Sequence, residues 1–102
     1  MTHVGVGEGW EPDEETGGLV HMVRADDSLQ VGLWKPNGAA DRRIDYELAA
    51  EETLVVLQGS GEVRVDEGEP IPLRPGVILC LSRGSRVSWL VDDDFRELWI
   101  YS

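Results

Sequence analysis

Three acidic residues lie close enough along the chain to supply the oxygen ligands of a metal site. Asp45 and Glu47 alternate within one segment, and Glu52 follows shortly after. Three carboxylates completed by water would suit a hard cation such as magnesium, calcium or manganese. The same segment favours another interpretation, because Ile44 and Tyr46 alternate with the acids and would face a core, which turns Asp45 and Glu47 to solvent. The sequence thus favours a solvated acidic face and leaves the three-carboxylate site as the alternative.

Histidine, cysteine and arginine offer few routes to catalysis in this chain. His3 and His21 are the only histidines, so no histidine base follows residue 21, and we interpret His21 as an ordinary strand residue. Cys80 lies in the apolar stretch VILCLS and is interpreted as a small buried hydrophobic residue. Arg83 and Arg86 surround a glycine in a predicted turn. They could clamp an anionic ligand, although a solvated turn is the favoured interpretation.

Aromatic residues could line a ligand pocket. Five of them lie in segments with strand composition: Trp34, Tyr46, Trp89, Trp99 and Tyr101. In such segments aromatic side chains belong to the core more often than to a binding platform. A small barrel can nevertheless hold one small ligand, and aromatic walls with a few polar groups are the usual lining of such a pocket. Both roles therefore stay open for these residues.

The composition restricts the partners and the compartment of the protein. Nine Lys and Arg against twenty Asp and Glu give a formal net charge of -11, which repels nucleic-acid phosphates and anionic lipids. The single cysteine allows no internal disulfide, and the first residues show neither the basic opening nor the apolar run of a signal peptide. We therefore expect a cytoplasmic protein that binds neither nucleic acid nor membranes.

The elements that must position these residues are predicted to be short β-strands. The 102 residues fit one domain. Residues 1–18 form an acidic, glycine-rich arm with Trp10 as its anchor, and residues 19–102 form the domain. Turn residues recur with the spacing typical of an all-β sandwich or barrel. Nine strands are predicted, near residues 19–24, 29–35, 42–48, 53–59, 61–67, 70–74, 77–82, 86–91 and 95–101.

The order of the turns is more specific than the strands. Six residues separate Glu52 from Gly59, a hairpin follows, and Pro75-Gly76 opens a later apolar strand. This order resembles the cupin superfamily, the RmlC-like jelly-roll barrels. Further matches resemble the cupin domain of ureidoglycine aminohydrolases: Gly32-Leu33-Trp34, Glu51-Glu52, Val56-Leu57-Gln58-Gly59 and Trp89. The resemblance covers residues 29–101 and implies an all-β fold, a cupin-like jelly-roll barrel (double-stranded β-helix).

The resemblance also implies a metal site whose ligands this chain lacks. Metal-binding cupins usually carry two histidines before the glutamate and a third in the second motif. The corresponding positions here are Asp45 and Glu47, or Tyr46 and Leu48, and near Val87 in the second motif. None of these residues is a histidine, and valine cannot bind a metal. We therefore expect no metal cofactor, with Asp45, Glu47 and Glu52 as the alternative ligands.

The resemblance directs Glu52 into the barrel and places Trp34 and Trp89 in its pocket; Tyr46 is the fourth candidate ligand-binding residue. Glu52 is the only catalytic candidate, as a general base, although it could instead pair with an arginine.

Three functions stay open at this stage. The first is a metal-free protein that binds a small organic molecule in the barrel. The second is an enzyme acting on a small metabolite, an aminohydrolase or isomerase that uses Glu52. The third is a homodimeric structural or interaction domain that pairs through sheet edges, for which residues 95–101 are the candidate strand.

Overall fold

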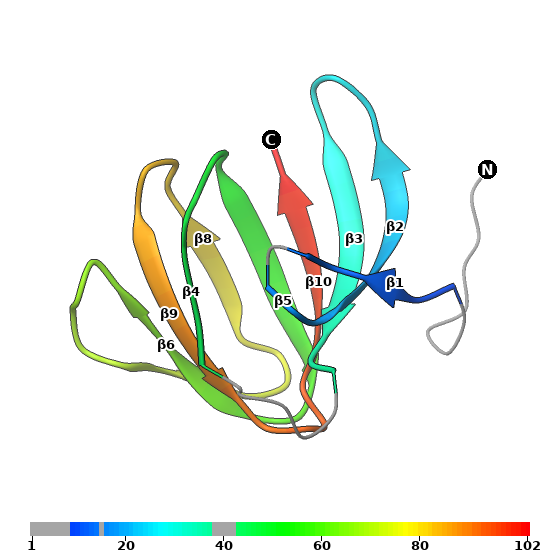
Figure 1. Cartoon of the computed structure of the whole chain (residues 1–102). Helices are drawn as coiled ribbons and strands as arrows, with labels where there is room; N and C mark the ends of the chain where they lie inside the picture. Colours follow the sequence, from blue (N-terminus) through cyan, green and yellow to red (C-terminus); the bar gives the residue numbers. More distant parts are fainter. Residues whose placement is uncertain (1–8, 15, 38–42) are drawn as a thin grey trace.

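The structure is a computed structural model that describes residues 9–14, 16–37 and 43–102. These residues form ten β-strands in two antiparallel sheets. Figure 1 shows how the strands are arranged. The described residues contain no helix that could cross a membrane. The prediction of an all-β fold is confirmed, and nine of the ten strands correspond to the nine predicted segments.

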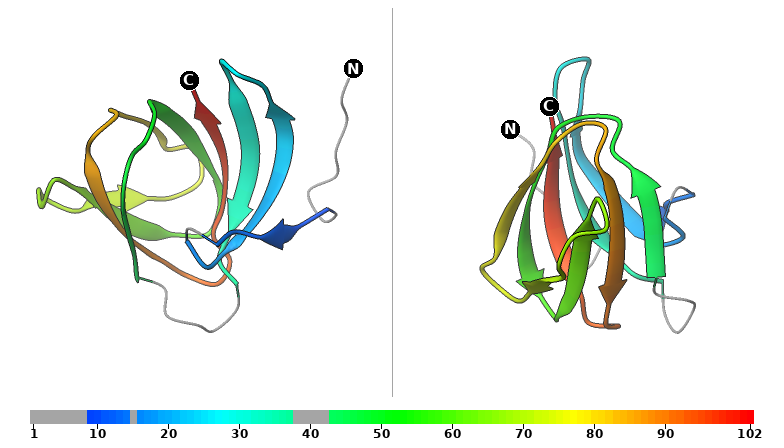
Figure 2. Two further views of the ribbon diagram at one scale, coloured as in Figure 1. Left: turned by 45° about the horizontal axis from the view of Figure 1, so that its top comes forward. Right: turned by 90° about the vertical axis from the view of Figure 1, so that its left-hand side faces the viewer.

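The first sheet has six strands in the order β1-β2-β3-β10-β5-β8. Its strands are β1 (Glu11–Pro12), β2 (Leu19–Ala25), β3 (Gln30–Lys35), β5 (Glu52–Gln58), β8 (Ile78–Leu81) and β10 (Arg96–Tyr101). The second sheet has the order β4-β9-β6-β7. Its strands are β4 (Arg43–Glu47), β6 (Gly61–Val65), β7 (Ile71–Leu73) and β9 (Arg86–Val91). The chain passes repeatedly from one sheet to the other, and the two sheets curve around a common interior (Figure 2).

The core lies between the sheets because each strand turns alternate side chains inward. On β9, Trp89 is buried, whereas Arg86 and Leu90 are exposed. On β4, Ile44 is buried while Asp45 and Glu47 face solvent, as the alternation predicts. The buried apolar cluster comprises Trp34, Ile44, Leu48, Leu54, Val56, Val63, Leu73, Leu81, Val87, Trp89, Val91, Phe95 and Trp99.

Two predictions about individual strands are wrong. Residues 95–101 are not an edge, because β10 pairs with β3 on one side and with β5 on the other. Apolar residues on both faces of β10 suit such a central position, and the homodimer prediction loses this edge as its support. Cys80 is exposed rather than buried, because β8 turns Leu81 inward and Cys80 outward with Ile78, which is 66% exposed.

The N-terminal arm is attached to the first sheet over its described part. The Trp10 ring meets the His21 ring edge-on with centroids 6.2 Å apart, and Lys35 Nζ lies 4.4 Å from the centroid of the Trp10 ring. Trp10 therefore contacts the body as predicted, and β1 adds a short pairing with β2 that was not predicted. His21 lies in β2 as expected, whereas His3 lies outside the described residues.

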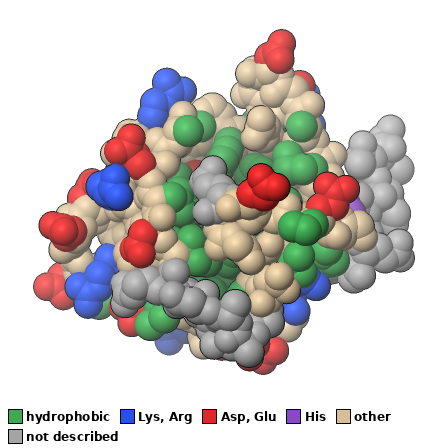
Figure 3. Space-filling model, viewed as in Figure 1, with side chains coloured by type: hydrophobic (Ala, Val, Ile, Leu, Met, Phe, Trp, Pro, Cys, Tyr) green, Lys and Arg blue, Asp and Glu red, His purple; other side chains and the backbone are tan. Residues whose placement is uncertain are grey.

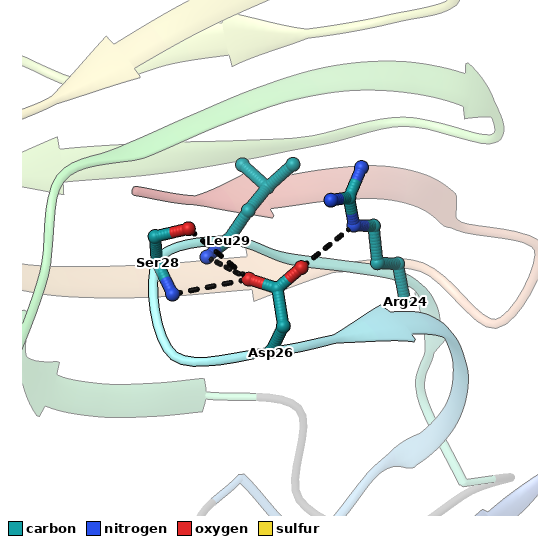
Figure 4. A network of polar contacts seen from close by, with 4 residues as sticks. All are labelled: Arg24, Asp26, Ser28 and Leu29. Carbon is teal, nitrogen blue, oxygen red and sulfur yellow. Dashed lines mark hydrogen bonds and ion pairs between the residues drawn. The ribbon is translucent and has the colours of Figure 1, made fainter.

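The turn between β2 and β3 is closed by one carboxylate (Figure 4). Asp26 Oδ1 accepts hydrogen bonds from the backbone N–H groups of Ser28 and Leu29, at 3.0 and 2.8 Å. Asp26 Oδ2 accepts a 2.9 Å bond from Arg24 Nε. The bond from Ser28, followed by those from Arg24 and Leu29, lowers the pKa of Asp26, because all of them favour the ionised form. The ionised carboxylate thus acts as the cap of this turn.

Candidate ligand-binding site

A cavity of about 180 Å³ lies between the two sheets. Strands of both sheets contribute its aromatic walls: Trp34, Tyr46, Trp89, Trp99 and Tyr101. Three aliphatic residues, Val20, Met22 and Ile44, complete its apolar lining. The polar lining consists of Asp13, Thr16, Glu52 and Glu97. Figure 3 shows hydrophobic side chains gathered in the central part of one face, with acidic side chains beside them.

The pairing of β10 with its two neighbours brings the site residues together. Glu97 lies opposite Trp34 of β3, and Tyr101 lies opposite Glu52 of β5. Both glutamates therefore enter the interior from adjacent strands of one sheet. Trp99 lies opposite Gly32, and a Cβ atom at Gly32 would stand only 2.5 Å from the Trp99 indole. Glycine at position 32 thus leaves the space that the Trp99 indole occupies beside β3.

The N-terminal segment completes the cavity wall. Thr16 Oγ1 accepts a 2.8 Å hydrogen bond from Trp34 Nε1 and donates a 2.7 Å bond to Asp13 Oδ2. The Gly17 N–H donates to the Asp13 carbonyl oxygen at 2.8 Å, which closes the turn. This turn fixes the orientation of the Trp34 indole and brings two polar side chains to the cavity.

Two glutamates are buried in the site, with exposed fractions of 2% for Glu52 and 6% for Glu97. Glu97 Oε2 accepts no hydrogen bond from any residue that the structure describes. Burial raises the pKa of Glu97 well above its usual value, and the nearby charge of Glu52 raises it further. The carboxyl group of Glu97 therefore tends to hold its proton.

Tyr46 and Trp89 add two buried donors. Burial raises the pKa of the Tyr46 hydroxyl, and the charge of Glu52 adds to this effect; the adjacent Trp89 side chain opposes it. Tyr46 thus keeps its proton. Trp89 Nε1 is buried as well, and the Trp89 side chain is a hydrogen-bond partner of Tyr46. The site therefore presents a carboxyl group, a phenol and an indole N–H to a bound molecule.

The structure brings the four predicted ligand-binding residues together: Trp34, Tyr46, Glu52 and Trp89 all line the cavity. Sequence reasoning missed Glu97. Glu97, Trp99 and Tyr101 are spaced by two residues in FRELWIY, and this spacing could have placed all three on the same face of the strand. Sequence reasoning also missed the contribution of the N-terminal segment, because the glycine-rich composition predicted a loose arm.

The alternative metal ligands do not converge. Asp45 and Glu47 are exposed, and Asp45 borders a separate depression on the second sheet, whereas Glu52 points into the cavity. The third histidine position of the metal-binding cupins falls near Val87, which is a buried aliphatic residue. No group of three His, Cys, Asp or Glu suited to a metal occurs among the described residues. These residues do not fit the metal centre that the cupin resemblance implies.

The two arginines of the predicted clamp lie away from the cavity. Arg86 is exposed and lies 3.8 Å from Glu47, and the Arg83 backbone N–H donates to Glu51 Oε2 at 3.2 Å. Arg83 is also exposed. Their solvated environment agrees with the favoured interpretation of this turn.

The comparison with protein families identifies the domain. A family model described as the EutQ-like cupin domain matches residues 23–97. The chain belongs to this family. The more specific resemblance to ureidoglycine aminohydrolases is not confirmed by this match. A search of curated proteins found no similar sequence.

Solved structures share the fold of this EutQ-like cupin. A protein of Salmonella typhimurium LT2, provisionally named ethanolamine utilization protein Q, is 18% identical with a TM-score of 0.77. The alignment covers 99% of this chain and 91% of that one. KdgF from Halomonas is 17% identical with a TM-score of 0.74, over 99% of this chain and 92% of that one. A cupin superfamily protein of Desulfitobacterium hafniense is 20% identical with a TM-score of 0.70, over 82% of this chain and 75% of that one. At these identities the likeness concerns the jelly-roll fold alone.

Proposed function

We propose that this EutQ-like cupin binds one small organic molecule in the cavity without a metal ion. One observation supports this function above the others: aromatic walls surround a buried carboxyl oxygen, Glu97 Oε2, that lacks a partner in the described protein. A buried polar group without a hydrogen bond costs about 1–3 kcal/mol. A molecule that supplies the missing partner would recover this energy.

The volume of the cavity limits the size of the ligand. An apolar cavity of roughly 150 Å³ can hold benzene, which has six non-hydrogen atoms. The 180 Å³ found here therefore suit a molecule of similar size or slightly larger.

Thermal denaturation with a panel of small metabolites tests the proposal. Binding at a concentration of about 100 times Kd stabilises the folded state by about 2.7 kcal/mol. Since about 1 kcal/mol shifts the Tm of a domain of this size by roughly 4–8 °C, an increase above about 10 °C is expected. A chelator should not change the effect, and a shift that requires added metal would contradict metal-free binding.

A cavity-filling variant shows whether binding occurs in the barrel. Val20→Phe adds a ring to the cavity lining and should abolish the ligand-induced shift. Ile78→Phe adds the same bulk on an exposed position of β8 and should leave the shift unchanged. Equal ligand response in both variants would place binding elsewhere, and the proposed site would be wrong.

An enzyme is the second candidate, and the two buried carboxyl groups favour it. Glu97 tends to hold a proton in the site, so it could act as an acid while Glu52 acts as a base. The residues that resemble ureidoglycine aminohydrolases agree with an aminohydrolase or isomerase-like reaction. Incubation of each bound compound with the protein, followed by NMR, would detect turnover. Glu52→Gln should remove this turnover while the fold remains, and continued activity in that variant would exclude Glu52 as the base.

A further inference from the structure

We infer that the ligand is a small organic cation, an ammonium compound whose charge lies between the aromatic rings and the carboxylate of Glu97. This inference rests on the proposed function, because it names the chemical class of the molecule that the cavity binds. Three features support it: the aromatic walls, the acidic polar lining and the unpartnered oxygen of Glu97.

The aromatic walls suit a cation. Trp34 lies directly opposite Glu97 in the pairing of β3 with β10, so an indole and a carboxyl group approach the same part of the cavity. Trp99 and Tyr101 follow Glu97 on the inward face of β10, with ring centroids 4.7 Å apart. A cation within about 6 Å of such ring faces is attracted by their quadrupoles, most strongly where water is excluded.

The charged lining has one sign. Among the described residues that border the cavity, the carboxyl groups are those of Asp13, Glu52 and Glu97, and no lysine, arginine or histidine lies beside them. A bound anion would meet these carboxylates, and a neutral molecule would leave Glu97 in the protonated form that burial favours. A cation instead gives Oε2 of Glu97 the partner that the described protein does not supply. Charge complementarity thus separates the three ligand classes.

Binding of a cation beside Glu97 should be coupled to the release of a proton. In the empty site burial raises the pKa of Glu97, and a bound cation favours the ionised form. Binding of a cation should therefore release up to one proton, and affinity should increase with pH. The titratable groups that border the same cavity are Glu52 on β5, Tyr46 on β4, Tyr101 on β10 and Asp13 on the N-terminal segment. The variant Glu97→Gln separates the proton of Glu97 from theirs.

Isothermal titration with isosteric probes tests the inference. Choline and n-butylammonium provide the cation, 3,3-dimethyl-1-butanol and 1-butanol are their neutral counterparts, and 3,3-dimethylbutanoate is the anion. We expect a cation to bind about 30-fold tighter than its neutral counterpart. Titrations in buffers of different ionisation enthalpy should show proton release that Glu97→Gln abolishes.

Variants distinguish the role of Glu97 from a general effect of charge. Glu97→Gln keeps the size of the side chain and should weaken cation binding at least tenfold, with little effect on the alcohols. Glu47→Gln removes the same charge from the exposed side of β4 and should leave both affinities unchanged. Cation binding that survives Glu97→Gln unchanged would overturn the inference.

The outcomes also separate this inference from the proposed function. If an alcohol or the carboxylate binds at least as tightly as the ammonium compounds, the cation is excluded but a ligand site in the barrel stands. The same conclusion follows if the metabolite panel yields only neutral or anionic ligands. If neither the probes nor the panel bind, the inference and the proposed function both fail.

Discussion

Glu97 should make the stability of the empty protein fall as the pH rises. Its folded-state pKa is raised well above the ordinary value of 4.5, so the folded state keeps a proton that the unfolded state loses. For such a group the stabilisation is complete below the unfolded pKa and is lost as the pH rises toward the folded pKa. Within that interval the loss approaches about 1.4 kcal/mol per pH unit.

The variant Glu97→Gln isolates this effect, because glutamine resembles the protonated acid and does not titrate. At pH 4 the variant and the wild type should have similar free energies of unfolding. Above pH 5 the free energy of unfolding of the variant should exceed that of the wild type. The difference should grow by about 1.4 kcal/mol for each pH unit until the folded pKa of Glu97 is reached. Urea denaturation, followed by tryptophan fluorescence at several pH values, measures both free energies.

The control and the refuting result are equally specific. Glu47→Gln removes one carboxylate from the exposed side of β4 and is the control for the loss of a single charge. A difference between Glu97→Gln and the wild type that stays constant from pH 4 to 7 would refute the argument. It would mean that Glu97 ionises in the folded protein as readily as in the unfolded chain.

Two further substitutions and one titration test the local structure. Gly32→Ala should lower the free energy of unfolding by about 1–3 kcal/mol, because its Cβ would stand 2.5 Å from the Trp99 indole; an unchanged urea midpoint would contradict this packing. Thr16→Val removes the acceptor of the Trp34 indole N–H and should cost about 1–3 kcal/mol, with a shift of the indole proton resonance in NMR spectra; spectra identical to the wild type would exclude that bond. Asp26 should titrate below 3.8 by NMR, so its contribution to stability is present above that pH and is lost as the pH falls; a midpoint at or above 3.8 would disprove the capped turn.

The sequence predicts the fold well because alternation and turn residues are local signals. The nine predicted strands are β2 to β10, and the inward set of β4 follows directly from the apolar residues Ile44 and Tyr46. Pairing order is not local. The prediction that β10 is an edge strand was wrong for this reason. A strand with apolar residues on both faces suits a central position in a sheet and also an edge that pairs with another subunit. The prediction that Cys80 is buried was wrong for a related reason. Alternation assigns side chains to two faces of a strand but does not show which face is covered by the other sheet.

The candidate site is predicted only in part, because its polar residues depend on tertiary contacts. Glu52, Trp34 and Trp89 were found from the cupin resemblance, and all three line the cavity. Glu97 carries the same alternation signal as Trp99 but was not recognised, because an acidic residue in a strand usually indicates solvent. Thr16 could not be found from local pattern, since its role depends on a hydrogen bond to a side chain 18 residues away.

The burial of Glu97 and its unpartnered oxygen lower the stability of the ligand-free protein, and the same two features favour a cationic ligand. A buried carboxyl group with an unpartnered oxygen contributes little to folding, and an apolar residue of the same size would pack there at lower cost. An ammonium ligand changes this balance, because it stabilises the ionised form that burial disfavours. The stability slope of the empty protein and the proton released on binding are therefore two measurements of one ionisation. If the slope is present but ligands bind without proton release, Glu97 stays protonated in the complex and the bound molecule is not a cation at that carboxylate.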